Sequence, residues 1–117
     1  MDKKYDLEER LLNFASNCID VAEALPRSFA GNHIASQLVR SASSPALHYG
    51  EAQAAESTSD FIHKMKIAAK EADETDYWLG LCSDSKNYPD TSDLLLKIET
   101  IHKILSKIIS TSKSKAA

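Results

Sequence analysis

The sequence predicts an all-α protein, an antiparallel up-down-up-down four-helix bundle, and three observations lead to this prediction. The 117 residues include only three glycines and three prolines, so long uninterrupted elements are expected. Apolar residues recur every three or four positions in four separate segments, which is the period of an amphipathic helix. Short connections join these segments and place consecutive helices antiparallel. The whole chain, 1–117, is therefore expected to form a single domain with a buried core.

The first helix is expected at about 5–25 and the second at about 33–56. Apolar residues line one side of the first helix at Leu7, Leu11, Phe14, Cys18, Ala22 and Leu25. Pro26 ends this helix, because the residue before a proline disfavours the helical conformation. Asn32 then stands where the N-cap of the second helix is expected.

Pro45 falls inside the second expected helix, where a proline removes a hydrogen bond and costs roughly 3 kcal/mol. Two interpretations are open: a kinked but continuous helix, or two separate helices. The apolar pattern keeps its phase across the proline, which favours the kink. Neighbouring serine hydroxyls would then bond to the carbonyls that the proline frees.

The third helix is expected at about 58–87 and the fourth at about 92–110, followed by a frayed tail at 111–117. Residues 57–60 provide an N-cap for the third helix, and residues 91–93 provide capping side chains for the fourth. Cys18 and Cys82 lie in phase with the apolar positions of their helices. Both are expected to be buried, reduced thiols in the core.

Four carboxylates precede the only tryptophan, Trp78, within six residues: Glu71, Asp73, Glu74 and Asp76. Successive residues of a helix are rotated by about 100°, so these side chains spread around it and do not converge as metal ligands must. Arg40 on the second helix is expected to pair with Glu71 or Glu74. This interpretation makes the three residues a structural ion pair, and Arg40→Ala should destabilise the protein by about 1–3 kcal/mol if the pair is partly buried.

Ile67, Trp78 and Leu81 lie nearly opposite the core side of the third helix, together with Tyr77. A single bundle would leave this second apolar face in water. The pattern therefore predicts self-association through the outer faces of the second and third helices, with Ile67, Trp78 and Leu81 at the oligomer interface. The alternative is that packing within one bundle covers these residues.

Two pairs, Asp60 with His63 and Glu99 with His102, have the spacing of the ligands in di-metal helical bundles. Their helical angles place them outside the core or at its edge, so a di-metal enzyme is disfavoured and no metal or cofactor is expected. The sequence also lacks a glycine-rich phosphate loop. No residue stands out as catalytic, and the protein is expected not to be an enzyme.

The formal net charge of −3 provides no overall attraction for nucleic acid. Lysines are nevertheless frequent after residue 94, and Lys97, Lys103 and Lys107 form a candidate nucleic-acid edge whose affinity is expected to be weak. No apolar run approaches the roughly 18 residues of a membrane span, and the first residues lack the apolar centre of a signal peptide. We therefore expect a cytoplasmic protein with no membrane contact.

Two stretches carry a resemblance to a known family. They are RSASSPALHYGEAQAAES at 40–57 and DFIHKMKIAAKEADETDYWLGL at 60–81. Both resemble the four-helix-bundle proteins related to the 23S rRNA intervening-sequence protein, also called the S23 ribosomal protein family. The resemblance implies an antiparallel bundle, assembly as a homopentamer and no known enzymatic activity. It also implies a structural role for Arg40, Glu51, Glu71 and Trp78.

A related branch of that family consists of basic accessory proteins of retroelements that bind nucleic acid and a reverse transcriptase. The present chain lacks their basic surface and has His48 where relatives have asparagine. The resulting hypothesis is a non-enzymatic homo-oligomeric scaffold or binding module. An RNA- or DNA-binding accessory protein is the alternative, and a di-metal enzyme is disfavoured.

Overall fold

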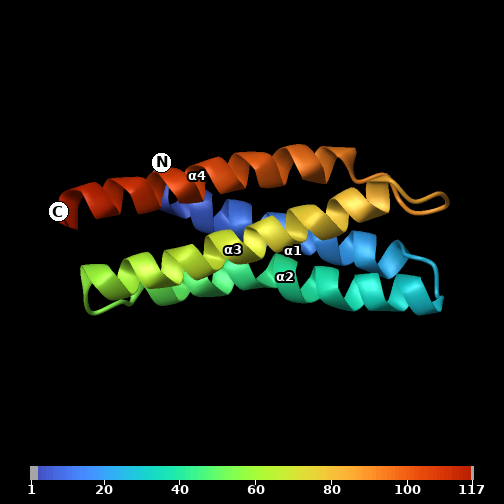
Figure 1. Cartoon of the computed structure of the whole chain (residues 1–117), viewed down its shortest axis with the longest axis horizontal. Helices are drawn as coiled ribbons and strands as arrows, with labels where there is room; N and C mark the ends of the chain where they lie inside the picture. Colours follow the sequence, from blue (N-terminus) through green and yellow to red (C-terminus); the bar gives the residue numbers. More distant parts are fainter. Residues whose placement is uncertain (1–2, 117) are drawn as a thin grey trace.

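The computed structural model describes residues 3–116, which form four α-helices and no strand. The helices are α1 (Lys3–Ala24), α2 (Phe29–Gln53), α3 (Thr58–Ser83) and α4 (Ser92–Ala116). Each helix packs against the next one in the chain, and α4 also packs against α1. Both termini lie at the same end of the elongated molecule (Figure 1). The predicted antiparallel four-helix bundle is thus confirmed.

The core runs along the whole bundle and contains residues from all four helices. The largest of its apolar side chains with less than 2% exposure are Leu11, Leu38, Met65, Leu79, Ile98, Ile101 and Leu105. Small residues, among them Ala42, Ala68 and Ala72, are buried between them. This alternation lets helices approach closely while large side chains interdigitate. The helical periodicity of the sequence therefore identifies the side of each helix that faces the core.

The start of α2 differs from the expectation by four residues. Ser28 is the N-cap, because its Oγ accepts a hydrogen bond of 3.0 Å from the Gly31 amide, and the helix begins at Phe29. Asn32 is already inside the helix. A Cβ on Gly31 would lie 1.9 Å from the carbonyl oxygen of Pro26. The glycine thus permits a tight turn from α1 into α2. This turn is shorter than the sequence pattern suggested.

Pro45 lies inside a continuous α2 and is buried, so the helix is not broken into two. The hydroxyls of Ser41 and Ser43 do donate hydrogen bonds to preceding carbonyls, as expected near a proline. Their acceptors belong to Leu38, Val39 and Arg40. The carbonyl that a proline at position 45 frees is that of residue 41. The carbonyls that accept from these hydroxyls therefore lie one to three residues before the one expected.

The ends of α3 follow from local chemistry. Ser57 caps it as expected, accepting a hydrogen bond of 3.0 Å from the Asp60 amide. The helix ends at Ser83, four residues before the predicted end. Asn87 follows in the left-handed region with φ of 69°, a conformation that asparagine tolerates better than most residues. The predicted turn therefore begins earlier and is longer than the sequence suggested.

α4 begins at Ser92 as expected, but its capping and its end depart from the expectation. Thr91 does not cap the helix with its side chain, since its buried hydroxyl donates to the Leu79 carbonyl of α3 at 2.8 Å. Asp90 accepts instead from the Ser92 amide at 3.0 Å, and these bonds lower the pKa of Asp90. The helix continues to Ala116, through most of the segment expected to fray at 111–117. That segment contains no glycine or proline to end a helix, and lysines in the last turn interact favourably with the helix dipole.

Candidate functional site

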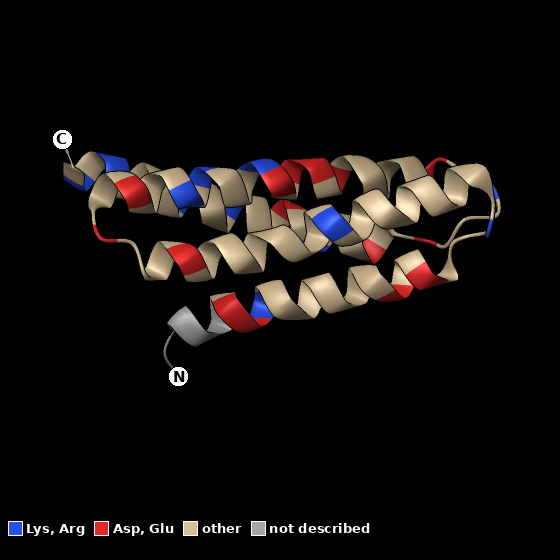
Figure 2. Cartoon of the chain, turned by 90° about the horizontal axis from the view of Figure 1, so that it is seen from below, with Lys and Arg blue, Asp and Glu red and all other residues tan. Residues whose placement is uncertain are grey.

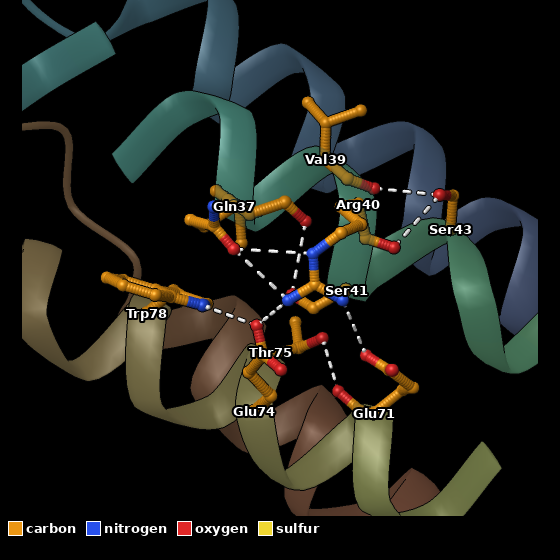
Figure 3. A network of polar contacts seen from close by, with 10 residues as sticks. Gln37, Val39, Arg40, Ser41, Ser43, Glu71, Glu74, Thr75 and Trp78 are labelled. Carbon is orange, nitrogen blue, oxygen red and sulfur yellow. Dashed lines mark hydrogen bonds and ion pairs between the residues drawn. The ribbon is translucent and has the colours of Figure 1, made fainter. Parts of the chain in front are cut away.

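A polar network crosses the seam between α2 and α3, and Arg40 is at its centre (Figure 3). Its Nη1 atom donates to Oε2 of Glu71 at 3.2 Å, and its Nη2 atom pairs with Oε2 of Glu74. The two carboxylates are one helical turn apart on α3, so a single guanidinium reaches both. Arg40 therefore contacts both of the residues between which the sequence left a choice.

Two neutral side chains complete this network. Gln37, one turn before Arg40, accepts hydrogen bonds from Nε and Nη2 of the guanidinium at 3.3 and 3.2 Å. The indole Nε1 of Trp78 donates to the same Glu74 oxygen at 3.0 Å. Glu74 thus joins a residue of α2 to the indole of α3 (Figure 3). The Arg40 side chain remains 49% exposed, so water reaches the network from outside.

A second ion pair crosses the same seam nearer to its other end. Nζ of Lys64 lies 3.6 Å from Oε1 of Glu51, and the same oxygen is 3.0 Å from Nδ1 of His48. His48 therefore neighbours the acidic residue that pairs across the helices. Together with Arg40, these contacts define the antiparallel register of α2 and α3, which have the most extensive contact in the bundle.

The three residues predicted for the oligomer interface occupy different environments. Trp78 is half-buried and packs against the core, with its ring edge-to-face at 5.8 Å from His33 of α2 and 4.9 Å from Tyr77. Packing within one bundle thus covers part of the indole. Ile67 is partly buried, and Leu81 is 36% exposed. The face is therefore less exposed than a projection of α3 alone indicated.

Leu47 is an exposed apolar residue that the sequence analysis did not single out. It lies on the solvent side of α2 with 61% of its surface exposed. The register set by Arg40 with Glu74 and by Glu51 with Lys64 places Leu47 at the level of Ile67 on α3. The two-faced pattern of α3 in the sequence contains no information on α2, so it does not identify this leucine.

A groove of about 640 Å³ runs between α3 and α4. Its lining residues are Ala72, Asp73, Asp76, Ser92, Leu95, Leu96, Ile98, Glu99, His102 and Lys103. A second hollow of about 390 Å³ shares Asp76 and Leu95 with it and extends to Tyr77 and Leu81. Tyr77 and Leu96 are 61% and 67% exposed. This surface between α3 and α4 is therefore both apolar and accessible.

His102 and Asp73 join the two walls of this groove. Nδ1 of His102 lies 2.8 Å from Oδ1 of Asp73, although the contact does not have the geometry of a hydrogen bond. The pair is ionic only when the imidazole is protonated. Glu99 and Lys103 form a separate pair at 3.4 Å on α4. Among the described side chains, those of residues 7–116, no group of three or more histidine, cysteine or acidic residues is arranged to hold a metal ion.

The candidate nucleic-acid edge on α4 is partly neutralised by neighbouring acids. Nζ of Lys97 lies 3.2 Å from Oδ2 of Asp93, and Lys103 pairs with Glu99. Lys107 is exposed and has no ion pair within the described part of the chain. Figure 2 shows basic segments near the C-terminal end of the bundle. The three lysines therefore present less free positive charge than their number suggests.

The two cysteines are free and buried. Burial raises the pKa of the Cys18 thiol from 9.0 to about 12, and it also raises the pKa of Cys82. A thiol with so high a pKa is a poor nucleophile near neutral pH, since the thiolate is the reactive form.

None of the described helices combines the length and the hydropathy needed to span a membrane.

Comparison with known proteins identifies a family and solved structures of similar fold. Residues 3–107 match the family model described as 23S rRNA-intervening sequence protein. A protein of unknown function from the S23 ribosomal protein family of Bacteroides thetaiotaomicron is 30% identical, with a TM-score of 0.81. The similarity covers 88% of this chain and 97% of that one. No curated protein matches the chain.

Proposed function

Since the chain belongs to the 23S rRNA-intervening sequence protein family, we propose that it is a non-enzymatic, cytoplasmic scaffold or binding module that assembles with copies of itself. The family resemblance supports five subunits. The proposed interface is the outer surface of α2 and α3, with Ile67, Trp78 and Leu81, and with Leu47 added from the structure.

Leu47 carries this proposal. Its side chain is 61% exposed at the level of Ile67, and the half-exposed Arg40 network follows it along the same seam. Apolar side chains beside an arginine and a tryptophan are typical of the centre of protein interfaces. A patch that is not complementary to itself favours head-to-tail contacts, and these close into a ring when the rotation permits.

Light scattering after size-exclusion chromatography, at micromolar concentration, tests the proposal. We expect the wild-type protein to have a mass close to five chains, and we expect Leu47→Glu to shift it toward one chain. A carboxylate at this position would be desolvated without a partner in the interface. Trp78→Lys should act in the same direction, although part of its effect would come from lost packing inside the bundle.

Leu12→Glu is the matched control, because Leu12 is 54% exposed on α1, outside the proposed interface. It should leave the mass of the assembly unchanged. Circular dichroism would establish that all variants remain folded. A wild-type mass near one chain would contradict self-association, whereas an unchanged assembly in Leu47→Glu would exclude this surface.

A further inference from the structure

We propose that the groove between α3 and α4 binds a basic amphipathic helix of another protein. This inference rests on the proposed function as a binding module and names the chemistry of the partner. The groove is separate from the Arg40 network, which lies on the opposite side of α3 toward α2.

The floor of the groove provides the apolar contact. Leu95 and Leu96 of α4 line it, and the adjoining hollow adds Tyr77 of α3. From Ala72 to Asp84 the surface follows α3 for about 18 Å, at 1.5 Å per residue. That length corresponds to about three turns of a partner helix, whose apolar residues would recur every three or four positions.

The rim provides the charge. Asp73, Asp76, Asp84 and Glu99 line the combined surface, against one lysine, Lys103. Asp76 and Asp84 make no ion pair with any described side chain, residues 7–116, so both carboxylates are free to meet lysines or arginines. Complementary charges at a rim increase the association rate and exclude partners of the wrong sign. An acidic rim beside leucines therefore selects a cationic amphipathic helix.

Other occupants fit less well. Nucleic acid and anionic membranes carry negative charge, which the unpaired carboxylates of Asp76 and Asp84 repel. An extended peptide would find no main-chain partners, since both walls are helices whose backbone groups are already bonded. A second copy offers Phe29, which is 94% exposed beside Arg27, but one aromatic side chain occupies only part of a three-turn groove.

Fluorescence anisotropy with a designed probe tests this proposal. The probe is a labelled helical peptide with leucines every three or four positions and lysines at the flanking positions. We expect saturable binding that weakens about tenfold or more in Leu96→Glu, because the new carboxylate would face leucines. Asp76→Lys should weaken binding, and so should an increase from about 50 to about 500 mM salt.

Three controls make the result specific. A peptide of the same composition in scrambled order should bind at least about tenfold more weakly, since it lacks the apolar stripe. A peptide with glutamate in place of lysine should not bind. Leu12→Glu, on α1, should leave the affinity unchanged. No saturable binding, equal binding of the scrambled peptide, or an equal loss in Leu12→Glu would overturn the proposal.

The mass of each variant separates this inference from the proposed self-assembly. Leu96→Glu should keep the wild-type mass while losing the peptide. If Leu96→Glu or Phe29→Glu lowers the mass instead, the groove is a contact between copies and the inference is wrong. If Leu47→Glu leaves the mass unchanged while the peptide still binds, the proposed interface is wrong and the proposed peptide site between α3 and α4 is supported.

Discussion

The planar guanidinium of Arg40 links α2 to α3. The strength of its ion pairs depends on how much water reaches them. The guanidinium contacts Glu71 and Glu74 together, but its side chain is 49% exposed. Exposed ion pairs contribute about 0.2–1 kcal/mol, and bidentate arginine pairs lie at the upper end. We therefore expect Arg40 to contribute to the free energy of unfolding at the lower limit of the range of about 1–3 kcal/mol that the sequence suggested.

We predict that Arg40→Ala lowers the free energy of unfolding by about 1 kcal/mol. Arg40→Lys should recover only part of this loss, because an ammonium cannot bond to both carboxylates in the same geometry. Urea denaturation measures both effects. Arg10→Ala is the control, since Arg10 is exposed and forms no ion pair with the described side chains of residues 7–116. A loss of less than a few tenths of a kcal/mol would show that solvent screens the network completely.

The buried thiol of Cys18 gives a second prediction at the scale of one residue. Its pKa of about 12 means that little thiolate forms at pH 8, so a thiol reagent should label the native protein slowly and the urea-unfolded protein fast. The folded state also retains its proton above pH 9, where the unfolded thiol ionises. The free energy of unfolding should therefore decrease as the pH rises from about 9 to about 12. Rapid labelling of the folded protein would contradict this.

At the scale of the helix, α2 depends on a glycine at its start. A Cβ at position 31 would lie 1.9 Å from the Pro26 carbonyl oxygen, a backbone atom that cannot move alone. We predict that Gly31→Ala destabilises the protein by about 1–3 kcal/mol, the usual cost of inserting an atom where there is no room. Thermal or urea unfolding would measure it.

Gly50 provides the matched control in the same helix. No atom lies within 4 Å of a Cβ built there. Gly50→Ala should therefore stabilise the protein by about 0.5–1 kcal/mol, because alanine loses less conformational freedom in a helix interior. Equal effects of the two substitutions would show that the turn before α2 relaxes to accept a side chain.

For the molecule as a whole, charge argues against strong nucleic-acid binding. The net charge is −3, and Lys97 and Lys103 are paired with acidic neighbours. We predict that RNA binds with a Kd of about 1–100 μM or weaker at about 150 mM salt, as is typical of nonspecific binding. A filter-binding titration checks this. Sub-micromolar binding that disappears in a Lys103→Ala, Lys107→Ala variant would favour the nucleic-acid alternative.

The sequence by itself determined the class of fold and the side of each helix that faces the core. Leu38, Met65 and Leu105 follow the helical period, and each is fully buried. This information is local, because the angle between two residues of one helix depends only on their separation. Local capping chemistry placed the N-cap of α3 within residues 57–60, where Ser57 is the cap. The start of α2 instead depended on the space around Gly31.

Only the tertiary structure decided how neighbouring helices are aligned, and the candidate surfaces depend on that alignment. Whether Arg40 meets one carboxylate or two depends on the register of α2 against α3, and so does the position of Leu47 beside Ile67. Trp78 lay outside the core in the projection of its own helix, yet α2 covers part of it. The acidic groove needs residues of α3 and α4 together. A single helix holds no information on register, because register results from contacts between residues far apart in the sequence.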